Sequence, residues 1–97
     1  LLMNQNYRLI KKLRIAHGGI SEFSVDIRII IREAVLCNAT ILAVCHNHPS
    51  GNLRPSLADN ELTKSILQAC NVMRIKLMDH VIITDGNYYS YKEEGIF

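Results

Sequence analysis

The sequence predicts an α/β domain with a mixed central sheet flanked by helices, and three observations support this fold class. Of the 97 residues, 48% are apolar and 21% are charged, which is the composition of a globular domain and not of a disordered chain. The apolar pattern changes its period several times, between the alternation of strands and the spacing of helices. A chain of this length has room for one hydrophobic core, so we expect a single domain over residues 1–97.

The N-terminal region predicts two strands. Residues 1–3 look like the end of an apolar run that would begin before position 1, and the polar residues 4–6 predict a turn. Residues 7–16 combine β-branched and aromatic side chains with basic ones, which favours a strand that Gly18 and Gly19 end.

Residues 25–36 suit either a strand or a helix. Four isoleucines in this segment favour a strand by propensity. One helical face, however, would collect Ile27, Ile30, Ile31, Ala34 and Val35. Because Ser24 can cap the start and Asn38 can take the C′ position at the end, we predict a helix.

The middle of the chain predicts a strand followed by the clearest helix. Residues 39–45 are apolar on both alternating faces, which predicts a central strand covered by helices, and Pro49 and Gly51 end it. Ser56 is a good N-cap for the next helix. Its buried stripe is predicted to contain Leu62, Ile66, Ala69 and Met73.

The C-terminal region predicts a hairpin. Residues 76–84 have the pattern of a strand, and Asp85, Gly86 and Asn87 are a hairpin turn signal. Residues 88–91 then return as a strand, and residues 92–97 form a tail.

Three residues are candidates for chemistry: His46, His48 and Asp59. The histidines are two residues apart at the end of a strand, so both side chains lie on one face. Asp59 is in the first turn of the following helix, which a short loop can fold back over the strand end. Two nitrogens and one carboxylate oxygen are the ligand set of a catalytic zinc site, with the fourth position left for water.

The predicted location of this site agrees with its chemistry, since ligands of α/β sheets bind beyond the carboxyl ends of strands. A metal ion held there would lower the pKa of its water and supply hydroxide near neutral pH. Histidine binds metal in its neutral form, so we expect the site to fail in acid. The same ligand set accepts other divalent ions, so it does not by itself identify zinc.

The spacing of His46, His48, Ser56 and Asp59 resembles the JAMM motif of the JAB/MPN metalloproteases. More narrowly, the strings HNHPSG, PSLAD and LMDHVIIT resemble the RadC family, bacterial proteins historically labelled as DNA repair factors. The resemblance implies the JAB/MPN architecture, which is cytidine-deaminase-like, with Zn²⁺ held by His46, His48 and Asp59. It also implies that Ser56 has a catalytic role, helping to hold the oxyanion of a tetrahedral intermediate.

What the resemblance implies for activity is a zinc-dependent hydrolase that cleaves a peptide or isopeptide bond in an unidentified protein substrate. The family motif also contains a glutamate, on a strand before the histidines, that takes the proton from the zinc-bound water. In RadC-like chains we expect it just before the segment that matches residues 1–3, so this chain is expected to lack that strand and its general base. Neither Glu22 nor Glu33 matches the family position.

Several of these residues have simpler interpretations. Ser56 and Asp59 fit a capping box, although the histidine pair favours the metal site, and Asp59 is not expected to serve both roles fully. Cys45 points to the opposite face from His46, so core packing is favoured over ligation. For His80, a hydrogen-bonded structural role is favoured over support of a metal ligand.

Two other functions stay open: a DNA repair or nucleic-acid-associated protein, and a non-catalytic metal-binding interaction module. The net charge of +2 is too balanced to indicate a nucleic-acid or membrane partner by itself. A deaminase is disfavoured because the H-x-E and P-C-x-x-C signatures are absent. We see no bilayer-spanning run or secretory signal, and three widely spaced cysteines indicate thiols in a reducing cytoplasm.

Overall fold

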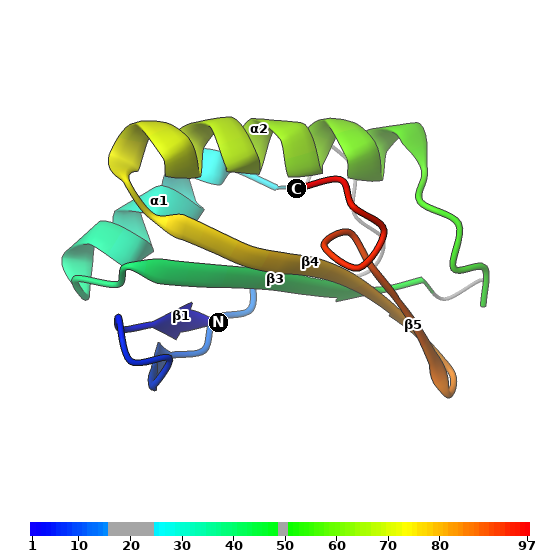
Figure 1. Ribbon diagram of the computed structural model, residues 1–97, viewed down its shortest axis with the longest axis horizontal. Coiled ribbons are helices and arrows are strands. Elements are labelled where there is room, and N and C mark those ends of the chain that lie inside the picture. Colours follow the sequence, from blue (N-terminus) through cyan, green and yellow to red (C-terminus); the bar gives the residue numbers. More distant parts are fainter. Residues whose placement is uncertain (16–24, 49–50) are drawn as a thin grey trace.

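The computed structural model describes residues 1–15, 25–48 and 51–97, whose elements form a mixed sheet with two helices (Figure 1). The strands lie in the order β2-β1-β3-β4-β5, which confirms the predicted α/β fold class. The strands are β1 (Leu2–Met3), β2 (Leu9–Lys11), β3 (Ile41–Asn47), β4 (Lys76–Thr84) and β5 (Asn87–Ser90), and the helices are α1 (Ile27–Leu36) and α2 (Leu57–Met73).

The strand β3 lies at the centre of the sheet, as its apolar sequence predicts. It pairs in parallel with β4 and antiparallel with β1, while β4 pairs antiparallel with β5. Parallel neighbours need a crossover connection, and α2 supplies it by packing against β4. The carboxyl ends of β3 and β4 therefore lie side by side.

Both helices lie on the same side of β3 and β4, and the main hydrophobic core fills the space between them (Figure 1). The buried residues of this core are Leu2, Ile30, Ala34, Ala39, Leu42, Leu62, Ile66, Cys70, Ile75 and Leu77. The opposite face of the sheet has a smaller cluster of Met3, Ile41 and Ala43. The prediction that Cys45 packs in the core is wrong: its side chain is exposed, and alternation along β3 places it on the face opposite His46.

The helix α1 confirms the helical interpretation of residues 25–36. Asp26 caps its start, where the side chain accepts a hydrogen bond from Arg28 N, while the predicted cap Ser24 lies outside the described residues. At the other end, Asn38 has a left-handed backbone (φ 56°) and its N–H bonds back to the last turn. This is the C′ position predicted for Asn38.

The helix α2 begins after Ser56, as predicted. Its buried side chains are those of Asp59, Leu62, Thr63, Ile66 and Cys70. The predicted stripe is therefore right at two positions and wrong at Ala69, which is half-buried, and at Met73, which is exposed. Thr63 lies on the buried face of α2 because its hydroxyl is hydrogen-bonded inside the fold. A pattern of apolar residues does not reveal such a position.

The strand β2 is much shorter than the strand predicted over residues 7–16. The side-chain oxygen of Asn4 accepts hydrogen bonds from Asn6 N (2.8 Å) and Arg8 N (3.1 Å). The turn that starts at Asn4 thus extends to Arg8 and includes Tyr7 at a positive φ of 61°.

The remaining strands follow their predicted ranges closely. The strand β3 starts and ends two residues later than predicted, because residue 39 still closes α1 and pairing with β4 continues through Asn47. The strand β4 has the predicted bounds, and the turn to β5 contains Gly86 at φ 77°. Gly18, Gly19 and Pro49 lie outside the described residues. In the described part of the chain, neither helix has the length and apolar character that crossing a bilayer requires.

Candidate metal centre

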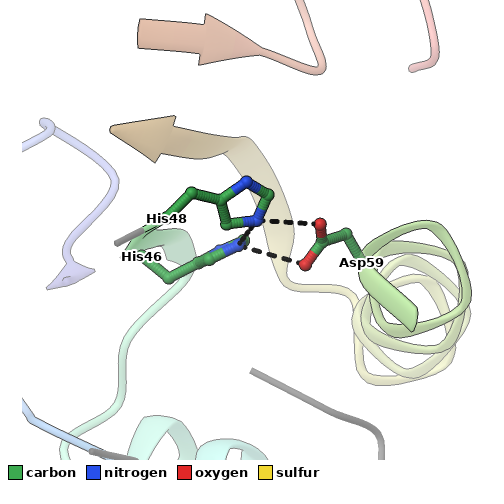
Figure 2. A group of neighbouring side chains, drawn as sticks. All are labelled: His46, His48 and Asp59. Carbon is green, nitrogen blue, oxygen red and sulfur yellow. Dashed lines mark hydrogen bonds and ion pairs between the residues drawn. The ribbon is translucent and has the colours of Figure 1, made fainter. Parts of the chain in front are cut away.

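His46, His48 and Asp59 meet at the carboxyl end of β3, beside the start of α2 (Figure 2). His46 Nε2 lies 3.1 Å from Asp59 Oδ1, and His48 Nε2 lies 3.0 Å from Asp59 Oδ2. The two Nε2 atoms are 3.2 Å apart. The structure thus brings together the three residues that the sequence predicts as ligands.

The Asp59 carboxylate is fully buried and contacts both the helix terminus and the histidines. Its Oδ2 accepts a hydrogen bond from Ser56 N (2.7 Å), and Ser56 Oγ accepts one from Asp59 N (3.1 Å), which completes a capping box. Its Oδ1 has no hydrogen-bond partner among the described residues, although His46 Nε2 approaches it without hydrogen-bond geometry. The capping box uses Oδ2 and leaves Oδ1 outside it.

The charge of Asp59 survives its burial. Burial alone would raise the pKa of this carboxyl, but hydrogen bonds, those from Ser56 first among them, hold the pKa below the ordinary value. A buried anion with one unpartnered oxygen is an unfavourable arrangement unless a positive group faces it.

His48 presents a nitrogen lone pair to this carboxylate. Its Nδ1 lies 2.7 Å from Asn52 O. A backbone carbonyl can only accept, so Nδ1 carries the hydrogen, and in the neutral ring Nε2 is left as the lone-pair atom. That atom is the one nearest Asp59.

His46 is supported from behind by His80. Burial lowers the pKa of His46, so its ring is neutral at neutral pH. His46 Nδ1 lies 2.9 Å from Nε2 of His80, which is fully buried and stacks on Tyr91. Burial lowers the pKa of His80 to about 4. His80 is hydrogen-bonded, as predicted. It also contacts His46, a role that the sequence analysis considered and did not favour.

The donor set fits a divalent metal ion. Donor atoms at about 2.0–2.1 Å from a tetrahedral ion lie about 3.3 Å apart, close to the 3.0–3.2 Å separations observed between the cluster's facing atoms. Two ring lone pairs and a carboxylate oxygen face one another at these distances, and a cation between them relieves their repulsion. Two imidazoles and one carboxylate suit zinc and also accept other divalent ions.

The other predicted or rejected site residues take different places. Ser56 is exposed at the start of α2, next to the cluster. Glu33 lies on α1 and pairs with Lys11 at 3.1 Å, so it is not part of the cluster, and Glu22 lies outside the described residues. The sequence interpretation missed Thr63, which hydrogen-bonds His80, because one threonine in an amphipathic helix carries no distinguishing signal.

Comparisons with known proteins agree with this geometry. Residues 1–96 match the model of a family described as the RadC-like JAB domain. A UPF0758 protein of Flavobacterium johnsoniae is 43% identical over 97 residues, which are 100% of this chain and 42% of that protein. A UPF0758 protein of Haemophilus ducreyi is 47% identical over 93 residues, 96% of this chain and 41% of that protein. The chain therefore spans about two fifths of the length of these relatives.

Proposed function

The chain belongs to the RadC-like JAB domain family, and from this premise we propose that it forms the zinc centre of a hydrolase that cleaves an amide bond, in a peptide or an isopeptide linkage. One observation carries the proposal. Two histidine nitrogens and a buried carboxylate, whose Oδ1 has no hydrogen-bond partner among the described residues, converge at the carboxyl end of a central strand.

In this proposal His46, His48 and Asp59 hold the ion through two ring nitrogens and a carboxylate oxygen. When bound, the ion would supply Lewis-acid chemistry, acidifying water and polarising the carbonyl of the amide. The protein's part is to keep the donors ready. The hydrogen bonds of Nδ1 in each ring direct the Nε2 lone pairs inward, and the Ser56 N–H fixes the carboxylate.

Ser56 is the chain's own candidate for stabilising negative charge on the substrate. Its Oγ accepts the Asp59 N–H, which leaves the hydrogen of the hydroxyl to be donated elsewhere. We assign that donor to the oxygen that becomes negative as the carbonyl is attacked.

The proton acceptor for the attacking water is assigned, by the family resemblance, to a glutamate that would precede the segment matching residues 1–3. The described glutamates do not join the cluster of His46, His48 and Asp59. Since the relatives are more than twice as long as this chain, the activity proposed here is that of the whole protein.

We propose a protein with a peptide or isopeptide linkage as the substrate, and the cytoplasm as the compartment. The support for the compartment is that Cys37, Cys45 and Cys70 are all free thiols. Such usage agrees with a reducing environment.

Metal content tests the first half of the proposal. The chain is stripped with a chelator, reloaded with Zn²⁺, freed of excess ion and analysed for zinc per polypeptide. We expect one equivalent in the native chain, a large loss in His48→Ala, and no change in Glu61→Gln, which alters an exposed carboxylate of α2 two residues after Asp59. No zinc in the native chain, or equal zinc in both variants, would contradict the metal centre.

Hydrolysis tests the second half. The 97-residue chain, the whole protein and the whole protein with the family glutamate changed to Gln are assayed on peptide and isopeptide substrates. We expect activity in the whole protein alone, because a positioned acid–base group contributes about 10²–10⁴-fold. Zinc bound by the whole protein without hydrolysis of either substrate class would favour the non-catalytic metal-binding module.

A further inference from the structure

A line of hydrogen bonds behind the metal centre links the backbone of α2 to the ring of His46. Thr63 Oγ1 donates to Asp59 O (2.8 Å) and also contacts His80 Nδ1. His80 Nε2 then lies 2.9 Å from His46 Nδ1. Both middle members are buried, Thr63 at 2% exposure and His80 at 0%. We call these two residues the Thr63–His80 pair.

The position of each hydrogen in this line follows from its carbonyl end. Asp59 O can only accept, so the Thr63 hydroxyl donates its single hydrogen there, and its oxygen accepts from His80 Nδ1–H. His80 is neutral in its fully buried position, so its Nε2 is an acceptor, and the hydrogen between the rings belongs to His46 Nδ1. His46 Nε2 consequently has no hydrogen, and it is the atom that faces Asp59 Oδ1.

We propose that Thr63 and His80 are positioning residues that hold His46 in its Nδ1–H tautomer, so that Nε2 is ready for the metal ion before the ion binds. The consequence for affinity rests on the proposed metal-binding function, whereas the tautomer itself rests only on the hydrogen bonds. In the opposite tautomer the hydrogen of Nε2 would point toward Asp59 Oδ1, where the ion is expected. That tautomer would also place a lone pair against a lone pair between His46 and His80, unless the His80 ring changed its tautomer and lost its hydrogen bond to the Thr63 oxygen.

Packing keeps the His80 ring in the orientation that this role requires. The ring stacks on Tyr91 with centroids 4.8 Å apart and planes 13° from parallel. Its backbone N–H donates to Asp79 Oδ1 (2.7 Å), and the parallel pairing of β3 and β4 holds His80 close to His46. The ring therefore meets Thr63 with one nitrogen and His46 with the other.

The test uses Thr63→Val with Thr63→Ser as its matched control. Valine has nearly the shape of threonine but removes the oxygen that accepts from His80, whereas serine keeps that oxygen. Long-range nitrogen–proton NMR correlations of the metal-free protein, at one fixed and slightly alkaline pH, report which nitrogen of His46 carries the hydrogen. Zn²⁺ affinity is then measured by competition with a chromophoric chelator, and thermal denaturation monitors folding.

We expect His46 to be the Nδ1–H tautomer in the native protein and in Thr63→Ser, and to gain Nε2–H character in Thr63→Val. Zinc affinity should fall in Thr63→Val, by no more than the about 10- to 100-fold that is typical when the direct partner of a metal-ligating histidine is lost, with little change in Thr63→Ser. His80→Phe keeps a ring against Tyr91 but removes the direct partner of His46, and should change the tautomer and lower the zinc affinity at least as much as Thr63→Val.

Three outcomes separate this inference from the proposed function. An unchanged His46 tautomer in both Thr63→Val and His80→Phe would overturn the positioning role, whatever the affinities. A changed tautomer with unchanged zinc affinity would overturn its link to metal binding. A native protein that shows the expected tautomers and their expected changes but binds no zinc would support the positioning role and contradict the proposed function instead.

Discussion

Replacing Asp59 by asparagine should separate the two roles of this side chain. Asparagine keeps a side-chain oxygen that can accept the 2.7 Å hydrogen bond from Ser56 N, so the capping box can persist. It removes the charge and replaces the other oxygen by an NH₂ group, which cannot ligate a metal ion. That NH₂ group would stand 3.1 Å from His46 Nε2, where it can donate to the ring lone pair.

The expected magnitudes differ widely between the two roles. A preserved cap should change the free energy of unfolding by less than about 1 kcal/mol, within the range of cap substitutions. Loss of a residue that supports a ligand lowers metal affinity about 10- to 100-fold. The zinc affinity of Asp59→Asn should fall further than this, because a ligand itself is lost. The complementary variant Ser56→Ala removes a capping acceptor but keeps the carboxylate. It should lower stability by about 0.5–2 kcal/mol and retain zinc.

Zinc competition with a chelator and thermal denaturation of the metal-free proteins, measured on both variants, decide the matter. For a domain of this size, 1 kcal/mol corresponds to about 4–8 °C in Tm. Native zinc affinity in Asp59→Asn would refute the ligand role and leave Asp59 as a helix cap. Loss of zinc from a Ser56→Ala protein that is still fully folded would show that capping and ligation are not separable.

Acid, capping and thiol chemistry supply three further expected outcomes. Burial lowers the pKa of His80 from 6.5 to about 4. Between these two pKa values the unfolded chain binds a proton that the folded protein excludes, so the free energy of unfolding should fall by roughly 3 kcal/mol as the pH drops from 6.5 to about 4. A stability that stayed constant in urea denaturation over this pH range would contradict the reasoning. Asp26→Ala should destabilise the protein by about 1 kcal/mol through loss of the α1 cap, while Asp26→Asn should not, as measured by urea denaturation. Iodoacetamide at mildly alkaline pH should modify the exposed Cys45 well before Cys70, because burial raises the pKa of the Cys70 thiol to about 11. Equal modification rates of the two thiols, measured by mass mapping, would disprove this.

Local rules were sufficient wherever a short stretch determines its own structure. The bounds of β4 follow from its apolar pattern, and the start of α2 follows from the capping preference of Ser56. The end of α1 at Asn38 follows from the tolerance of asparagine for a left-handed backbone. The spacing of the two histidines and Asp59 was enough to predict that these side chains converge.

Long-range contacts account for what the sequence did not reveal. Cys45 alternates correctly away from His46, but whether a helix covers that face depends on the path of the whole chain. The contact of His80 with His46 depends on the parallel register of β3 and β4, and that of Thr63 depends on which face of α2 turns inward. The turn at Asn4 shortened β2 because one side-chain oxygen accepts two backbone N–H groups.

The most direct test of the metal centre is an anomalous difference map from crystals of the chain grown with Zn²⁺. We predict one strong peak within about 2.0–2.2 Å of His46 Nε2, His48 Nε2 and a carboxylate oxygen of Asp59. The absence of a peak between these side chains, or zinc bound only elsewhere on the protein, would contradict the central claim that these three residues form a metal site.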